Sequence, residues 1–442
     1  MSSPAERSLV VHPGGPVSGT LRVPGDKSLS HRSVIFGSLA RGTTEVQGLL
    51  EGEDVLRTLA AFRSMGVAME RPAPGHYRIH GSGLEGLTEP DTVLDLGNSG
   101  TAIRLLTGLL SGLPFHAVVT GDDSLRRRPM GRVVEPLRRM GARIDGRQGG
   151  QLAPLSIRGV DLLPLDYASP IASAQVKTAL LLAGLTAPGV TSVSEPRMSR
   201  DHTERMLAAF GGEVVRDGLR VSVAGWCDLQ AQRLTVPGDI SSAAFPLVAA
   251  LVTPGSLLRI EGVGVNPTRT GLLDLLLAMG GDIRRENERM EGGEPVADLV
   301  VCHSSLRGIE VPPEVVPRAI DEFPIFFVAA ALAEGVTVAR GLEELRVKES
   351  DRIHAMAVEL AKVGAVLEEL EDGMRLEGRP EGLTSAGVLV DSHTDHRIAM
   401  SLLVAGLRGN GPLTVSRTEN IDTSFPGFAD LMGGAGARIV AA

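Results

Sequence analysis

Residues 23–28 read VPGDKS and residues 236–241 read VPGDIS, so one short motif occurs twice in the chain. The second copy begins 213 positions after the first, which is close to half of the 442 residues. Such a spacing indicates two related halves. We expect the crossovers between the halves near Leu21 and near Leu234, because the first repeat begins only after a leading strand. That strand would then belong with the C-terminal half.

A shorter repeat runs through both halves. A helical stretch closes on glycine and a strand-like run follows, as in SMGVAM, RMGARI, AFGGEV, AMGGDI, KVGAVL and GAGARI. The closing glycines stand 69 to 84 positions apart, at Gly66, Gly141, Gly211, Gly280, Gly364 and Gly436. Six units therefore fill the chain, which predicts three units in each domain. The expected domains are residues 22–233 and residues 1–21 plus 234–442.

Each unit has the same predicted order of elements. A short strand leads to a polar helix start and an apolar helix, and three of these helices end near Gly42, Gly112 and Gly335, where glycine can adopt the left-handed conformation. A β-rich run and a second, amphipathic helix follow. In the fifth unit this second helix is expected to begin after Ser350, a candidate N-cap. The pattern predicts an α/β fold.

The amino-acid composition is typical of a globular protein with a net negative charge. The hydrophobic share of 43% and the charged share of 22% allow large buried cores. The net charge of -9 and the aromatic share of 3% argue against nucleic acid and anionic membranes as partners. Cys227 and Cys302 lack CxxC partners, so neither a disulfide framework nor a zinc site is indicated. No signal peptide or membrane span is visible, which makes the cytoplasm the expected location.

The polar helix starts carry most of the candidate chemistry. They read GDKSLSHR, GNSGTAIR, IASAQVK, GDISSAAF, AIDEFPIF and HTDHRIAM. Asp26, Asn98, Asp239 and Asp321 could simply cap these helices. Helix N-termini also attract anions through their free N–H groups and the positive end of the dipole. Several such ends facing one centre would therefore bind polyanions.

Lys27 is the sharpest difference between the two copies of the motif, because Ile240 stands at its place in the second copy. A cation at a helix N-terminus is electrostatically unfavourable, and a bound anion would explain its presence. Ser28 and Arg32 follow on the same segment and could join that site. Arg32 could equally belong to a solvated helix face.

Further cations stand in residues 126–128 (RRR), 346–352 (RVKESDR) and 395–397 (DHR), and each run could also be a surface ion-pair cluster. The histidines lack metal-site spacing, and the chain contains no Walker loop, no strand-GxGxxG-helix unit and no GxSxG elbow. The residues alone thus predict small polyanionic substrates bound between the domains. Asp321 and Glu349 are the candidate acid–base groups.

Eight ordered motifs give a specific resemblance. They are PGDKSLSHR, GNSGTAIRLL, RRPMGRVVEPLRRMGA, SAQVKTALLLAGL, AIDEFPIFFVAAALAEG, LRVKESDRI, DHRIAMSLLVAGL and SFPGF, and they extend from about Pro24 to Pro426. In these motifs the chain resembles the enolpyruvyl transferases, and within them the 5-enolpyruvylshikimate-3-phosphate synthase family. The resemblance implies a two-domain inside-out α/β barrel, with three βαβαββ repeats and pseudo-threefold symmetry in each domain. It also implies an active site in the cleft between the domains.

The resemblance further implies a reaction. The enolpyruvyl (carboxyvinyl) group of phosphoenolpyruvate would pass to the 5-hydroxyl of shikimate 3-phosphate, and phosphate would be released. This step belongs to the shikimate pathway, which leads to chorismate and the aromatic amino acids. The implied partners are the two small substrates and glyphosate as an inhibitor, with no metal, no cofactor, no nucleic acid and no membrane. The family default is a monomer.

The family's functional residues carry over onto matching positions of this sequence. Shikimate 3-phosphate would be held by Lys27, Ser28, Arg32, Ser173, Gln175, Arg200, Asp321 and Lys348. Phosphoenolpyruvate would be held by Lys27, Asn98, Gly100, Arg128, Gln175, Arg352 and Arg397. Lys27, Asp321 and Glu349 would be catalytic, with Asp321 accepting the hydroxyl proton and Glu349 protonating the methylene carbon.

Three positions depart from the best-known branch of the family. Ala174 replaces a second serine, Leu105 replaces a proline and Thr423 replaces a lysine. These residues resemble the branch that includes glyphosate-tolerant members. Gly100 nevertheless leaves room for a longer phosphonate, which predicts inhibition by glyphosate.

Alternative functions remain open at this point. The UDP-N-acetylglucosamine enolpyruvyl transferases share the fold and the donor, but they carry a cysteine in the loop that corresponds to residues 121–132, where this chain has none. A binding homologue without catalysis is a second alternative, against which the joint presence of Lys27, Asp321, Glu349 and Arg397 argues. RNA 3′-terminal phosphate cyclase is a more distant one, and the acidic composition disfavours it.

Overall fold

The computed structural model describes residues 7–442, which form two compact domains. The N-terminal domain comprises Gly25–Val236 together with Met290–Glu294. The C-terminal domain comprises residues 7–24, Pro237–Arg289 and Pro295–Ala442. Both expected crossovers, at 21/22 and 233/234, thus lie three residues before the observed ones.

Six sheets lie within residues 7–442, and they correspond to the six repeats. In the N-terminal domain their strand orders are β14-β3-β5-β4, β6-β7-β9-β8 and β10-β11-β13-β12. The strands are β3 (Arg41–Gln47), β4 (Ala68–Ala73), β5 (His76–Ser82), β6 (Leu94–Asp95), β7 (His116–Thr120), β8 (Arg143–Gly146), β9 (Leu152–Arg158), β10 (Asp166–Ala168), β11 (Val190–Ser194), β12 (Val214–Asp217), β13 (Arg220–Ala224) and β14 (Arg233–Thr235). Within each sheet the first pair is parallel and the others are antiparallel.

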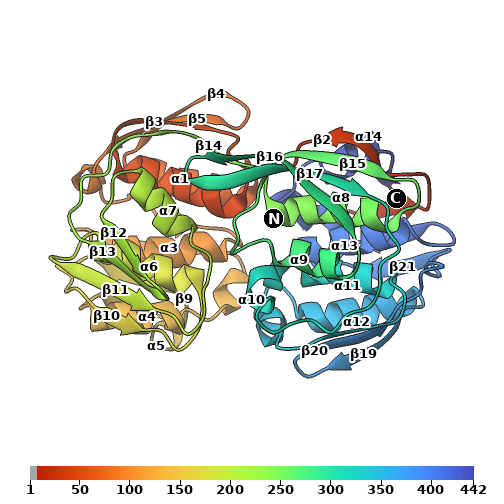
Figure 1. Ribbon diagram of the computed structural model, residues 1–442. Coiled ribbons are helices and arrows are strands. Elements are labelled where there is room, and N and C mark those ends of the chain that lie inside the picture. Colours follow the sequence, from red (N-terminus) through yellow and green to blue (C-terminus); the bar gives the residue numbers. More distant parts are fainter. Residues whose placement is uncertain (1–6) are drawn as a thin grey trace. The chain divides into compact units, whose positions relative to one another are not determined.

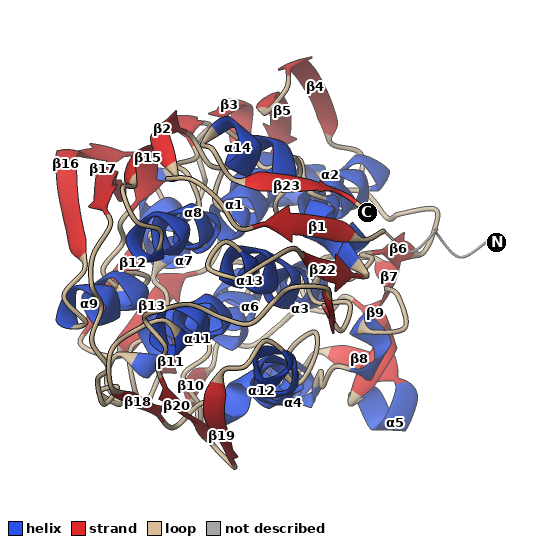
Figure 2. Cartoon of the chain, turned by 90° about the vertical axis from the view of Figure 1, so that its right-hand side faces the viewer, coloured by secondary structure: helices blue, strands red, loops and turns tan. Residues whose placement is uncertain are grey.

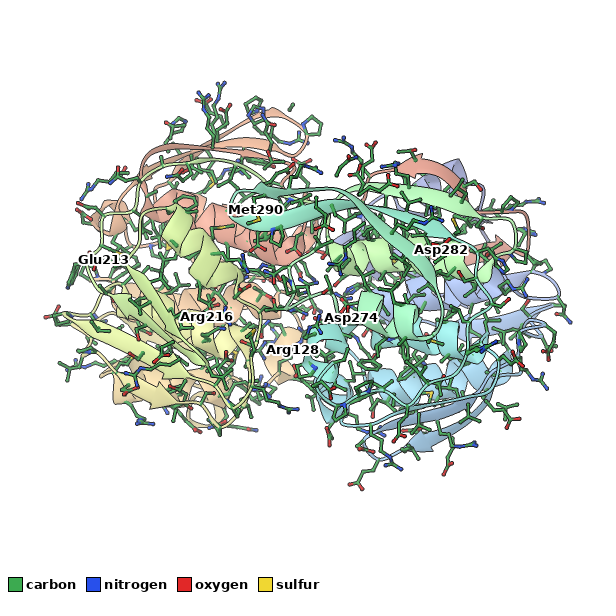
Figure 3. The ribbon with its side chains drawn as sticks, viewed as in Figure 1. Arg128, Glu213, Arg216, Asp274, Asp282 and Met290 are labelled. Carbon is green, nitrogen blue, oxygen red and sulfur yellow. The ribbon has the colours of Figure 1, made fainter. Side chains whose placement is uncertain are left out.

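The C-terminal domain repeats this plan, with strand orders β16-β17-β15-β2, β18-β20-β19 and β21-β22-β1-β23 in its described residues. The strands are β1 (Leu9–His12), β2 (Ser18–Leu21), β15 (Leu257–Gly264), β16 (Asp282–Glu291), β17 (Glu294–Cys302), β18 (Val336–Ala339), β19 (Val366–Leu370), β20 (Gly373–Glu377), β21 (Val388–Asp391), β22 (Leu413–Ser416) and β23 (Arg438–Ala441). Met290, labelled in Figure 3, lies near the end of β16 and is the first residue of the segment Met290–Glu294, which is counted with the N-terminal domain.

The strand that precedes each domain in the chain pairs with a sheet of the other domain. β2 pairs in parallel with β15 of the C-terminal domain, as the sequence predicts for the leading strand. β14 pairs in parallel with β3 of the N-terminal domain, with Leu234 opposite Val46 and Thr235 opposite Gln47. The prediction that residues 234 and 235 belong to the C-terminal domain was therefore wrong, because their backbone completes the first N-terminal sheet.

In each domain the first helix of every repeat lies inside the ring of sheets, as expected for an inside-out barrel. In the N-terminal domain the inner helices are α1 (Lys27–Leu39), α3 (Gly100–Leu110) and α6 (Ala174–Gly184), and in the C-terminal domain they are α8 (Ile240–Val252), α11 (Phe323–Ala331) and α13 (His396–Gly406). All residues of α8 and α11 are buried. Figure 1 shows α1, α3 and α6 enclosed by their strands, and Figure 2 shows α8, α11 and α13 packed side by side.

A second helix in each repeat closes on the predicted glycine. These helices are α2 (Glu53–Ser64), α4 (Gly131–Arg139), α7 (His202–Ala209), α9 (Gly271–Ala278), α12 (Arg352–Lys362) and α14 (Phe428–Gly434). The six glycines that follow them all have φ between 80° and 103°, which glycine adopts without strain. Gly42 and Gly335 are also left-handed, but Gly112 is not. A Cβ at Gly112 would lie 1.8 Å from Thr186 Oγ1, so close packing explains the glycine there.

The helix caps agree with the sequence only in part. Asp26 and Asp239 accept hydrogen bonds from the backbone N–H groups of Leu29 and Ser241. Ser99, not Asn98, caps α3, and Asp351, not Ser350, caps α12. Asp321 lies in the 3-10 turn Ile320–Glu322 before α11 and caps no helix.

Candidate active site

The start of α1 places Lys27 beside a carboxylate. The Asp26 side chain accepts from Leu29 N at 2.8 Å, which fixes the first turn of the helix. Lys27 Nζ lies 3.1 Å from Asp54 Oδ2 on α2, and the lysine side chain is 23% exposed. Asp54 therefore offsets the unfavourable position of this cation at a helix N-terminus.

Arg32 is buried inside the N-terminal domain, so the alternative of a solvated helix face is excluded. Its Nε donates to Thr203 Oγ1 at 2.7 Å, Nη1 to Ser28 O at 2.9 Å and Nη2 to Thr178 Oγ1 at 3.0 Å. Burial lowers the pKa of Arg32 to about 10, against the raising effect of Glu204, so the guanidinium remains charged at neutral pH. A buried positive charge thus lies directly behind Ser28.

His31, the neighbour of Arg32, gives the fold a predicted acid sensitivity. Burial lowers the pKa of His31 to about 4 from 6.5, so the folded protein holds a neutral ring that bonds Thr58 Oγ1 at 2.8 Å. Between pH 4 and 6.5 the unfolded chain binds the extra proton and the folded chain does not, so stability falls as the pH falls through this range. The free energy of unfolding, measured with urea, should fall by about 2 kcal/mol between pH 7 and pH 5 because of His31. His31→Gln should lose less over the same interval, and an equal loss in both proteins would contradict the assignment.

The start of α3 brings Asn98, Gly100 and Arg128 together. Arg128 Nη2 donates to Asn98 Oδ1, and Asn98 Nδ2 donates to Asp122 Oδ2 at 2.7 Å. A Cβ at Gly100 would lie 2.8 Å from Arg128 Nη1, so any larger residue must displace that guanidinium. Figure 3 labels Arg128, which lies in the segment just before α4. Of the run 126–128, Arg128 is the member that turns toward the helix start.

Arg104 is a site residue that the sequence analysis missed. It lies on α3 with 8% exposure, and its Nη1 donates to Gly100 O at 3.2 Å and to Gln175 Oε1 at 2.8 Å. Gln175 Nε2 in turn donates to Thr101 Oγ1 at 3.1 Å. This arginine joins the starts of α3 and α6, and its place within the apolar run TAIRLLTGLL was a signal for such a role.

Ser173 begins α6, and its hydroxyl accepts from Val176 N at 3.5 Å as the N-cap. Its backbone N–H donates to Glu195 Oε1 at 2.8 Å. Arg200 lies on the loop after β11, near enough to Arg32 to lower the pKa of that guanidinium. Within the N-terminal domain, the predicted contacts for shikimate 3-phosphate therefore lie at the starts of α1 and α6 and on this loop.

In the C-terminal domain the central group is Arg352, the first residue of α12. It is 1% exposed, and its Nε donates to Asp395 Oδ2 at 2.8 Å while Nη2 donates to Glu349 Oε2 at 2.6 Å. Its Nη1 lies 3.6 Å from Asp321 Oδ1. Burial alone would lower the pKa of Arg352, but Asp395, Glu349 and Asp321 raise it above its ordinary value. Three carboxylates thus surround one buried guanidinium.

Asp395 fixes this cluster from the N-terminus of α13. Its side chain is fully buried and accepts from Arg352 Nε, from Ser350 Oγ at 3.1 Å and from Arg397 N at 2.9 Å. Burial would raise the pKa of Asp395, but Arg352 outweighs it and the pKa is lowered. The carboxylate is therefore ionised in the folded protein and acts as the anchor of Arg352.

The two candidate acid–base groups differ in their surroundings. Asp321 lies 3.4 Å from Lys348 Nζ and is 14% exposed at its side chain. Glu349 is 24% exposed at its side chain and is bound by the buried Arg352. Lys348 Nζ also lies 2.8 Å from Glu344 Oε1. The predicted group Asp321, Lys348, Glu349 and Arg352 is thus brought together in space.

Arg397 joins this group through the backbone. Its Nη1 donates to Asp321 O at 3.0 Å and lies 3.6 Å from Glu322 Oε1. Glu322 is 2% exposed and accepts from Ser241 Oγ, which also accepts from Arg269 Nη2 at 2.7 Å. Glu322 and Arg269 are further residues that the sequence analysis did not single out, because their contacts join elements far apart in the chain.

Two negative findings concern residues 7–442. They contain no group of three or more His, Cys, Asp or Glu side chains arranged to hold a metal ion. In the same part of the chain no helix combines the length and the apolar character that a membrane crossing requires.

The comparisons with known proteins point to one family. A model of EPSP synthase (3-phosphoshikimate 1-carboxyvinyltransferase) matches residues 11–432. The 3-phosphoshikimate 1-carboxyvinyltransferase of Magnetococcus marinus is 64% identical over 423 residues, which cover 96% of this chain and 95% of that protein. The protein of the same name from Geobacter sulfurreducens is 58% identical over 425 residues, covering 96% and 98%.

Solved structures agree with these relatives. EPSP synthase from Acinetobacter baumannii superposes with a TM-score of 0.90 at 50% identity, covering 99% of this chain and 100% of that one. The enolpyruvyl transferase NikO from Streptomyces tendae has a TM-score of 0.79 at 18% identity and covers 99% of each chain, which shows the fold alone. The two-domain inside-out barrel is thereby confirmed, and the chain belongs to the EPSP synthase family.

Proposed function

We propose that this chain transfers the enolpyruvyl group of phosphoenolpyruvate to the 5-hydroxyl of shikimate 3-phosphate and releases phosphate. The observation that carries the proposal is the buried Arg352 held among Asp321, Glu349 and Asp395 in a member of the EPSP synthase family. Arginine with fixed geometry suits the phosphate and carboxylate of the donor, and two further carboxylates supply proton transfer.

Shikimate 3-phosphate binds mainly through the N-terminal domain in this proposal. Lys27, Ser28 and Arg32 come from the start of α1, Ser173 and Gln175 from the start of α6, and Arg200 from the loop after β11. The backbone N–H groups and the positive dipole end of each helix add to the attraction for its phosphate and carboxylate. Asp321 and Lys348 complete the site from the C-terminal domain.

Phosphoenolpyruvate binds to the guanidinium groups of both domains. Arg128, Asn98 and Gly100 come from the N-terminal domain, together with Lys27 and Gln175, and Arg352 and Arg397 come from the C-terminal domain. The two substrates each carry a phosphate and a carboxylate, so without these cations their approach in a water-poor site would cost several kcal/mol.

The chemistry then needs one base and one acid. Asp321 removes the proton of the 5-hydroxyl while the oxygen forms its bond to C2 of phosphoenolpyruvate. Glu349 delivers a proton to the methylene carbon C3. The C–O bond to phosphate then breaks as the Glu349 carboxylate takes a proton back from C3, which restores the double bond, and the proton held by Asp321 leaves with the phosphate. Before the substrates arrive, the neighbouring Arg352 guanidinium favours the ionised form of Glu349. Anions bound at Arg352 offset this positive charge, so that Glu349 can carry the proton that it delivers.

Gly100→Ala should weaken inhibition by glyphosate by about tenfold or more. A Cβ at this position would lie 2.8 Å from Arg128 Nη1 and 3.0 Å from Arg104 Nη1, so it narrows the space for a molecule longer than phosphoenolpyruvate. The inhibition constants of the two proteins decide the matter. Gly433→Ala is the control, because a Cβ at Gly433 meets nothing within 4 Å, and equal constants for Gly100→Ala and the unchanged protein would refute the prediction.

The choice of acceptor tests the proposed function. Phosphate release from phosphoenolpyruvate should depend on shikimate 3-phosphate and should not occur with UDP-N-acetylglucosamine. The segment 121–132 contains no cysteine, and the two cysteines of the chain are unpaired at Cys227 and Cys302. Equal release with both acceptors would favour the alternative transferase, and no release with either would favour a binding homologue.

The monomeric state and the cytoplasmic location stay predictions.

A further inference from the structure

A buried ion cluster lies behind the proposed site of the N-terminal domain. Lys177 on α6 is 3% exposed, and its Nζ lies 3.0 Å from Glu195 Oε2 and 2.7 Å from Glu204 Oε1. Both carboxylates are themselves only 6% exposed. Removing three charges from water costs several kcal/mol per ion, so a cluster of this kind is a weak means of stabilising a fold. A role in holding other groups in place explains it better.

Glu195 joins two segments that carry proposed substrate contacts. Its Oε1 accepts from the backbone N–H of Ser173 at 2.8 Å, and its Oε2 accepts from Ser199 Oγ at 2.7 Å. Ser173 caps α6, and Ser199 directly precedes Arg200. One carboxylate therefore fixes the start of α6 against the loop that follows β11.

The remaining members hold this carboxylate in place. Lys177 is one turn along α6 from Ser173, and Glu204 comes from α7, so the cluster binds the two helices to each other. The adjacent residues Thr178 and Thr203 both accept from Arg32, and their hydroxyl oxygens lie 2.6 Å apart. The cluster is thus continuous with the buried guanidinium behind Ser28.

We infer that Glu195, fixed by Lys177, is a positioning residue that sets the Ser173 helix start and the Ser199–Arg200 loop in their binding arrangement before shikimate 3-phosphate arrives. This inference rests on the proposed function. Two segments that are already aligned lose little conformational freedom when the substrate binds, and small misplacements of binding groups cost large factors in affinity. Glu195 itself touches neither substrate.

Two variants test the inference through binding of shikimate 3-phosphate, measured by calorimetry, and through steady-state kinetics. In Glu195→Gln the amide has a single acceptor oxygen and places an NH₂ group beside the Lys177 ammonium or the Ser173 N–H. The Kd for shikimate 3-phosphate should rise about tenfold or more. Ser199→Ala removes only the tie to the loop, and the rise should be about threefold. The KM for phosphoenolpyruvate and kcat at saturating shikimate 3-phosphate should stay within about twofold of their original values.

Asp298→Asn is the matched control. Asp298 is 7% exposed and accepts from Gly262 N at 2.9 Å, Asn287 Nδ2 at 2.8 Å and Arg259 Nη1 at 3.0 Å, so it is an equally well-bonded buried carboxylate. Its loss should lower the urea midpoint without changing the Kd for shikimate 3-phosphate.

The outcomes separate the two proposals. If the unchanged protein turns over shikimate 3-phosphate and Glu195→Gln binds it equally well, the inference is wrong and the proposed function stands. The inference is also wrong if Glu195→Gln only lowers stability, as the control does. If the unchanged protein neither binds nor turns over shikimate 3-phosphate, the proposed function fails and the inference fails with it.

Discussion

Glu349→Gln should lower kcat by roughly 10²–10⁴ while both substrates still bind, because the amide keeps the shape of the side chain and cannot deliver a proton. Glutamine can still accept the hydrogen bond from Arg352 Nη2, which in the present protein spans 2.6 Å. The group around Arg352 therefore stays assembled. Calorimetry with shikimate 3-phosphate and steady-state assays with phosphoenolpyruvate measure the two effects separately.

A second readout ties this loss to proton transfer at carbon. In deuterium oxide the unchanged protein should introduce deuterium into the methylene group of phosphoenolpyruvate, and Glu349→Gln should do so much more slowly. Glu368→Gln is the control, because Glu368 is exposed on β19 and should leave kcat unaffected. An unchanged kcat in Glu349→Gln would exclude Glu349 as the proton donor. Loss of shikimate 3-phosphate binding in step with kcat would exclude it as well.

Arg352→Met should both destabilise the C-terminal domain and abolish useful binding of phosphoenolpyruvate. The substitution leaves Asp395 fully buried without the guanidinium that bonds it at 2.8 Å. An uncompensated buried charge of this kind costs about 3–5 kcal/mol, which urea unfolding followed by circular dichroism would show. The KM for phosphoenolpyruvate should rise by about 10² or more, since a charge-assisted bidentate contact is lost.

The contribution of the Arg352–Asp395 pair to stability also depends on pH. Because the pKa of Asp395 is lowered in the folded state, the pair stabilises the fold above about pH 4 and loses this contribution as the pH falls further. A double variant separates stability from binding: Arg352→Met with Asp395→Asn removes the stranded charge and should recover at least half of the lost stability. Binding of phosphoenolpyruvate should not return. Recovery of both, or of neither, would contradict the assigned roles.

Much of the fold could be predicted because repetition is visible in the chain itself. The closing glycines mark the ends of the six outer helices, and the polar starts mark the six inner ones. The assignment of β2 to the C-terminal half followed from the offset between the two VPGD motifs. The reciprocal position of β14 did not, because pairing with β3 depends on a contact between residues about 190 positions apart. Strand pairing at such a distance leaves no local pattern.

The candidate site was predictable where the residue type was locally out of place. Lys27 at a helix start is such a residue, and Arg104 and Lys177 within apolar helices could have been recognised in the same way. The sequence does not decide which residue caps α3 or α12, since Asn98-Ser99 and Ser350-Asp351 each offer two suitable side chains in a row. The contacts that fix the site, such as Arg32 to Thr203, arise only when distant helices pack together.

The proposed reaction forms an enolpyruvyl ether on shikimate 3-phosphate. The most direct measurement is carbon NMR of a reaction that contains shikimate 3-phosphate and phosphoenolpyruvate labelled with carbon-13 at C2 and C3. We predict that both labels appear in an enolpyruvyl group bonded to O5 of shikimate 3-phosphate, with one phosphate released for each group transferred. Labels that stay in phosphoenolpyruvate or appear as free pyruvate, with shikimate 3-phosphate unchanged, would contradict it.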